Sequence, residues 1–186
     1  MRGDHMRRTL DGLYLGAGYL AAAFLVIVFA IMMIMSLGRQ FGLNIPAGDD
    51  FAAWSMAAMS FLGLAHTFKR GEMIRVGLLL ERLKGKPKQA LEILSHAVGL
   101  AFVGYFLWAA SRFAYDSWRF NDMAQGTVAV PLWIPQLGFV LGLLLLGIAF
   151  LDELIHVLRG NPPSYEKPPP KTTEELLERV TEGGGV

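Results

Sequence analysis

Two histidines are the side chains with the clearest potential for chemistry. His66 and His96 are predicted toward the same ends of consecutive antiparallel helices, as paired axial ligands of a membrane haem would be. With helix boundaries near Phe68 and Gln89, His66 would lie about 3 Å deep and His96 about 10 Å, at about 1.5 Å per residue. Paired ligands need matched depths, so histidines satisfied by local hydrogen bonds are the favoured interpretation. A haem- or quinone-type membrane anchor of a respiratory complex stays open as an alternative.

The sequence offers little support for other kinds of catalytic or binding site. The 186 residues include no cysteine, which excludes disulfides, cysteine metal sites and thiol catalysis. There is also no nucleotide-binding glycine loop and no cluster of metal ligands. We therefore expect a protein that is not an enzyme and has no cofactor, metal site or nucleic-acid partner.

The elements that carry these histidines are predicted to be transmembrane helices. The chain is 53% hydrophobic and 18% charged, against roughly 25% charged in soluble domains. Residues 13–37, 51–68, 93–111 and 131–151 contain no Asp, Glu, Lys or Arg, and about 20 apolar residues cross the hydrocarbon layer. The predicted fold is an all-α integral membrane protein with a four-helix membrane domain over residues 13–159.

None of the four spans has a charged residue near its centre, where an ion path or proton relay would need one. A substrate path built by this chain alone is therefore not expected. A self-sufficient small transporter or channel is kept as the second alternative.

Lysines and arginines alternate in density along the chain. They are frequent in residues 1–12 and again from Arg159, and seven of the seventeen lie in residues 69–88. Residues 38–50 and 113–130 contain one each. The positive-inside rule then predicts that residues 69–88 and both termini are cytoplasmic.

The basic segment between the second and third spans has a helical pattern of its own. Ile74, Leu78 and Leu83 recur at helical spacing between charged residues. This pattern predicts a short amphipathic helix in the plane of the membrane. Its cations would bind anionic lipid headgroups, each contributing about 1 kcal/mol near the surface. Membrane lipids are therefore expected partners.

The two ends of the chain are predicted to lie outside the membrane domain. Residues 1–12 form a cytoplasmic N-terminus, of which residues 1–6 are set aside as a candidate cloning remnant. Residues 160–186 begin with the proline-rich stretch GNPPSYEKPPP, which predicts an extended cytoplasmic tail.

Two pairs of glycines have the spacing of a helix contact. Gly12 and Gly16 are four residues apart, as are Gly138 and Gly142, so each pair lies on one helix face. Small residues at this spacing let helix backbones approach closely in lipid. The faces either dock a partner or pack within the four helices.

The stretch GDDFAAWSMAAMSFLGLAHTFKRGEMIRVGLLLERL resembles the hallmark region of the small permease subunits of TRAP transporters, the DctQ-like family. The later stretch TVAVPLWIPQLGF is similar to the start of that family's fourth helix. The chain departs from the family pattern at Ala53, Met73 and Gly77. Candidate motif or interface residues are Asp49, Asp50, Trp54, Gly63, Lys69, Arg70, Glu72, Arg75, Pro131, Trp133, Pro135 and Gly138.

The resemblance implies a tripartite, ATP-independent uptake system in the bacterial inner membrane. In that family a periplasmic binding protein, DctP-like, delivers an organic acid to the membrane complex. A large DctM-like permease subunit carries the substrate and sodium sites. The small subunit, which this chain resembles, acts as a fixed membrane scaffold.

Overall fold

The computed structural model describes residues 2–43, 45–70 and 86–160. The chain forms helices α1 (Arg2–Gln40), α2 (Gly48–Arg70), α4 (Lys86–Arg119) and α5 (Trp133–Leu158). All four are long and apolar enough to cross a membrane, which confirms the predicted fold class. The predicted in-plane helix around residues 74–83 and the tail beyond residue 160 lie outside the described residues.

Each helix is longer than the uncharged span that predicted it. The third span was predicted over residues 93–111, whereas α4 has 34 residues, or about 51 Å at ~1.5 Å per residue. The hydrocarbon layer is only ~30 Å thick. Charged and polar residues therefore continue the helix beyond the apolar part, because lysine, glutamate and arginine are good helix formers.

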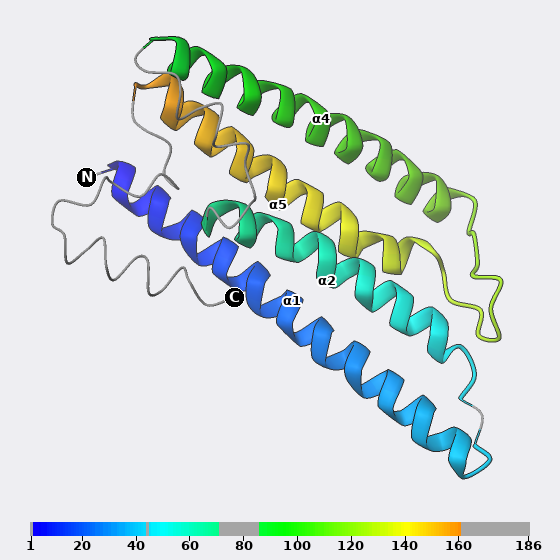
Figure 1. The fold of residues 1–186 in the computed structure, drawn as a ribbon. Coiled ribbons are helices and arrows are strands. Elements are labelled where there is room, and N and C mark those ends of the chain that lie inside the picture. Colours follow the sequence, from blue (N-terminus) through cyan, green and yellow to red (C-terminus); the bar gives the residue numbers. More distant parts are fainter. Residues whose placement is uncertain (1, 44, 71–85, 161–186) are drawn as a thin grey trace, which may run out of the picture.

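The four helices lie side by side in one open row (Figure 1). The order across the row is α1, α2, α5, α4, because α2 packs on α1 and α5, and α5 also packs on α4. α1 and α4 are thus the outer helices. Such a row can be stable in a membrane because lipid tails are as apolar as the side chains, so no hydrophobic force closes the bundle.

Three helices end at a residue with left-handed backbone conformation. Gly42, Asn121 and Gly160 have φ of 71°, 54° and 80° after α1, α4 and α5. The first two make the paired backbone hydrogen bonds of a Schellman cap, for example from Leu43 N to Gly38 O at 2.8 Å. These caps satisfy the last carbonyl groups and fix where each helix stops.

Contacts between α2 and α5 depend on glycine. A Cβ added at Gly138 would lie 2.7 Å from Cβ of Ala58, and one at Gly142 would lie 2.6 Å from Cβ of Phe61. Only glycine allows the two backbones to come this close. The pair Gly138 and Gly142 therefore packs within the row of helices.

The other glycine pair is different. A Cβ added at Gly12 or Gly16 would meet nothing within 4 Å among the described residues. These two positions do not pack within the described row, and a docking role for them stays a prediction.

Candidate functional site

A charged cluster joins three helices at the end of the row where α2 and α5 finish. Lys69 Nζ lies 2.9 Å from Asp152 Oδ2 and 3.7 Å from Glu153 Oε2. The same ammonium lies 5.9 Å from the ring centroid of Tyr14 on α1. We call Tyr14, Lys69, Asp152 and Glu153 the ionic cluster.

The ionic cluster is largely removed from solvent. The side chain of Glu153 is 1% exposed and that of Lys69 is 17% exposed. Charge attraction is stronger in such a low-dielectric site, and it must offset the cost of taking both charges out of water. Lys69 also lies in the last turn of α2, where the helix dipole favours a cation. The cluster therefore fixes the ends of α2 and α5 to each other.

Sequence reasoning named Lys69 and missed its partners. The uncharged fourth span ended at Leu151. Asp152 and Glu153 follow it within the predicted membrane domain of residues 13–159, and neither was named as a candidate. In the structure α5 continues to Leu158, and Glu153 lies on its buried face together with Ala149 and Leu146. The spacing of four and seven residues between these three positions was the signal that could have found Glu153.

The two histidines are held against different neighbours. His66 Nδ1 lies 3.2 Å from the Tyr14 carbonyl oxygen, and a Cβ at Gly18 would lie 3.0 Å from the His66 ring.

His96 has other surroundings. Its Nδ1 lies 2.7 Å from the carbonyl oxygen of Glu92, one turn earlier on α4. The His96 ring lies edge-on to Phe68 and Phe150, with centroid distances of 6.4 and 6.3 Å. In both histidines Nδ1 must donate to a carbonyl oxygen. These contacts suit structural histidines and offer no support for a shared haem.

At the opposite end of the row, residues from two separate sequence motifs meet. Trp54 of α2 and Pro135 and Gly138 of α5 line one apolar groove of about 240 Å³. Phe51 packs edge-to-face on Trp54 with a centroid distance of 5.2 Å. We call this the aromatic groove. Pro135 is tolerated there because it lies in the first turn of α5, where its missing N–H group has no helical partner to lose.

The two acidic residues at the start of α2, Asp49 and Asp50, have different surroundings. Asp50 is half-buried against Gly126, where an added Cβ would collide with the carboxylate. Asp49 is exposed and lines a polar pocket together with Arg39 at the end of α1. Both carboxylates also favour the helix start, because they lie near its positive end.

The loop before α5 is ordered by its own backbone. Pro131 forms an isolated antiparallel bridge with Met123, and Ala124 N donates to Val130 O at 2.9 Å. Trp133 follows as the first residue of α5. This loop therefore holds Gly126 close to Asp50.

The remaining predicted residues are placed as follows. Gly63 faces α1, and an added Cβ there would lie 3.8 Å from Cβ of Ala21. Arg70 ends α2, while Glu72 and Arg75 lie outside the described residues. Within the described ranges, no group of three or more metal-ligating side chains comes together.

A protein-family model matches most of the chain. The model of the family described as "Tripartite ATP-independent periplasmic transporters, DctQ component" matches residues 28–160, more than half of the chain. No curated protein matches the chain. The match covers all of α2, α4 and α5, and the four apolar helices agree with a multi-pass inner-membrane subunit. The chain therefore belongs to the DctQ family, the small membrane component of TRAP transporters.

Proposed function

We propose that this chain is a static scaffold for a large DctM-like permease subunit. That subunit would take up an organic acid, which a periplasmic DctP-like binding protein delivers. A sodium gradient would drive the uptake. The observation that carries the scaffold role is the open row of four helices (Figure 1). The ionic cluster holds this row together at one end.

An open row suits a scaffold better than a transport path. A path for an anion or a cation needs polar groups near the middle of the membrane. The charged side chains of α2 and α5 instead lie at Asp49, Asp50, Lys69, Arg70, Asp152 and Glu153, near the helix ends.

The row also offers a wide surface for a partner. α5 carries an exposed apolar stripe at alternating spacings of three, four and seven residues. A second transmembrane protein could pack against such a face. The stripe consists of Ile134, Leu137, Leu141, Leu144, Leu151, Ile155 and Leu158.

The proposed orientation places the ionic cluster on the cytoplasmic side, as the lysine and arginine distribution predicts. The natural absence of cysteine allows a direct test. A cysteine at Gln125, exposed in the loop before α5, should react with an impermeant thiol reagent added to intact cells. A cysteine at Gln89, exposed at the start of α4, should react only after the membrane is opened. The reverse labelling pattern would refute this orientation.

The scaffold role predicts that the chain alone does not transport. In proteoliposomes containing only this chain, we expect organic-acid uptake at the level of empty vesicles. Uptake should require the large subunit, the loaded binding protein and an inward sodium gradient together. Omitting each component in turn is the control. Sodium-driven uptake by the chain alone would favour the self-sufficient transporter instead.

A further inference from the structure

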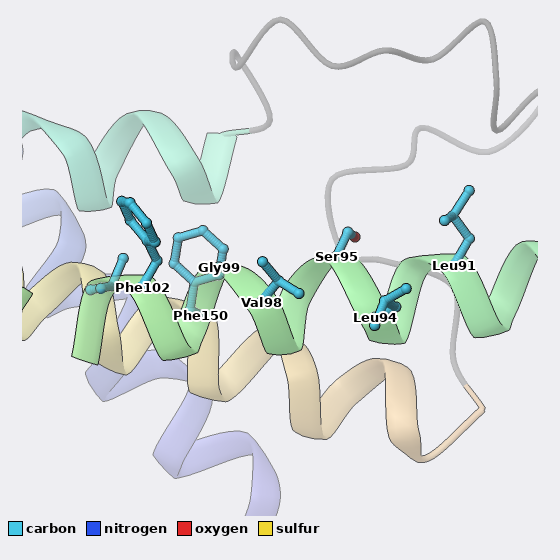
Figure 2. A pocket seen from close by; sticks show the side chains of 8 residues that line it. Leu91, Leu94, Ser95, Val98, Gly99, Phe102 and Phe150 are labelled. Carbon is cyan, nitrogen blue, oxygen red and sulfur yellow. The ribbon is translucent and has the colours of Figure 1, made fainter. Parts of the chain in front are cut away.

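Two hollows on the surface of the row differ in what they could bind. In the hollow between α4 and α5, Phe150 lies against Gly99 (Figure 2). The lining of this hollow contains no charged side chain, so it does not select one kind of ligand. The other hollow lies between the end of α1 and the start of α2 and has a volume of about 610 Å³. We call it the α1–α2 pocket, and most of the side chains that line it are polar.

Two opposite charges line the α1–α2 pocket. Arg39 of α1 and Asp49 of α2 are both exposed there. Within the described ranges, neither side chain forms an ion pair or a hydrogen bond, with the other or with a third residue. A ligand between them would need an anionic group for Arg39 and a cationic group for Asp49. A zwitterion satisfies both charges, whereas an anion or a cation satisfies only one.

The lining becomes apolar toward the interior of the membrane. Arg39 lies in the last turn of α1. Met35 and Met32 also line the pocket, four and seven residues before Arg39, so the three share one helix face. Met32 is about 10 Å from Arg39 along the helix, at ~1.5 Å per residue. A ligand that fills the pocket must therefore have a charged end and an apolar end.

Close packing of the two helices holds the walls of the pocket in place. A Cβ added at Gly48 would lie 2.5 Å from Sδ of Met35. Because Gly48 has no side chain, Met35 lies directly against the first turn of α2. This contact keeps the end of α1 against the start of α2, with Arg39 and Asp49 on opposite walls of one pocket.

The depth of the apolar end favours a lipid as the occupant. Met32 lies five residues before Leu37, where the uncharged span ends, so it is about 8 Å inside that boundary at ~1.5 Å per residue. A soluble protein or a soluble ligand does not reach this depth while α1 crosses a membrane. A phospholipid carries its charges and its acyl chains in the same order as the lining. The volume is also within the ~300–1,000 Å³ of small-molecule sites.

We propose that the α1–α2 pocket binds a phosphatidylethanolamine, with its phosphate at Arg39 and its ammonium at Asp49. A primary ammonium can donate three hydrogen bonds to a carboxylate. The quaternary ammonium of phosphatidylcholine has no donor and is usually held by aromatic rings, and the pocket lining contains no aromatic side chain. The inference depends on α1 crossing a membrane and not on the transport role, so it can fail while the proposed function holds.

Lipid retention after purification provides the test. The delipidated full chain is reconstituted in vesicles of equal phosphatidylethanolamine, phosphatidylcholine and phosphatidylglycerol, extracted in mild detergent and weighed by native mass spectrometry. We expect wild type to retain one phosphatidylethanolamine. Ser36→Trp fills the pocket and should lower this retention at least about tenfold. Leu37→Trp, at the next residue and 53% exposed outside the lining, should retain the lipid as wild type does.

The ammonium contact is tested at Asp49. Asp49→Asn should reduce the preference for phosphatidylethanolamine over phosphatidylcholine about fivefold, the upper range for one exposed ion pair. It should also raise the retention of phosphatidylglycerol, because the remaining Arg39 favours an anionic headgroup. Asp122→Asn removes an exposed carboxylate from the loop before α5, outside the pocket, and should leave the selection unchanged.

The phosphate contact is tested at Arg39. Arg39→Gln should lower the retention of all three lipids about fivefold, since they share the phosphate and lose one cation near the surface. Arg119→Gln removes an exposed cation at the end of α4, outside the pocket, and should have no effect. Glycerophosphoethanolamine, the soluble headgroup without acyl chains, should not displace the bound lipid, because it has no contact for Met32 and Met35.

Four results would overturn the proposal. They are equal retention of the three lipids by wild type, equal retention by the two tryptophan variants, displacement by the soluble headgroup, and loss of the lipid when the large subunit binds, which would make the pocket a helix interface. If Ser36→Trp fails to fold, the exposed substitution Asp49→Asn remains decisive, and unchanged lipid selection in that variant counts against the proposal.

Discussion

Replacing Lys69 by methionine is expected to lower the free energy of unfolding by about 3–5 kcal/mol, the usual cost of removing one partner from a buried ion pair. Methionine keeps most of the side-chain volume but removes the ammonium that lies 2.9 Å from Asp152. Two carboxylates would then share one site, and Glu153 is almost fully buried. The measurement is unfolding in mixed micelles with increasing sodium dodecyl sulfate, followed by helical circular dichroism.

Matched variants separate the ion pair from a general effect of charge. Arg159→Met removes an exposed cation at the same end of α5 and should change stability by less than about 0.5 kcal/mol. The triple variant Lys69→Met, Asp152→Asn, Glu153→Gln should recover most of the loss, because no buried charge is left in the ionic cluster. Equal stability of Lys69→Met and wild type would show that the cluster does not hold α2 and α5 together.

Gly142→Ala is expected to destabilise the row of helices by about 1–3 kcal/mol, the range for overpacking a close contact. The new methyl group would lie 2.6 Å from both Cβ and the carbonyl oxygen of Phe61, and α2 can only make room by moving away. Contacts along the whole α2–α5 interface would loosen as a result. The same unfolding measurement in mixed micelles reports the change.

Gly104→Ala is the control for this prediction. Among the described residues, nothing lies within 4 Å of a Cβ added at Gly104, and this glycine is also in the interior of a long helix. Both substitutions therefore raise the helix propensity equally, and only the one at Gly142 introduces a clash. If both variants are as stable as wild type, the close approach of α2 and α5 does not contribute to stability.

Much of the fold could be predicted from the sequence because the bilayer imposes a simple rule. A chain segment in hydrocarbon must satisfy its own backbone hydrogen bonds, so an uncharged run of about 20 residues has to be a helix. Helix existence and the family follow from such local patterns. The helix ends were less well predicted, because residues such as Asp152 and Glu153 continue α5 while looking like the start of a loop.

The candidate site was only partly predictable, for a reason specific to membranes. In a soluble protein, apolar spacing shows which face of a helix is buried. Here side chains that face lipid and side chains that pack are both apolar, so Gly142 and Gly104 look alike in sequence although one is a contact and the other is open. Family resemblance pointed to Trp54 and Pro135 separately, and only the packing of α2 on α5 brings them into the aromatic groove.

The sequence by itself determined that this protein is a set of four membrane-crossing helices with its basic residues in alternate loops, because length, apolarity and charge act on each segment independently. The tertiary structure alone decided that α5 lies between α2 and α4, that Lys69 pairs with Asp152, and that Trp54 and Pro135 line the aromatic groove. These features depend on which helices are neighbours. Lipid tails are as apolar as the helix surfaces, so hydrophobicity does not decide which helices pack together. Shape complementarity and a few buried charges decide it, and these charges make contact only after folding.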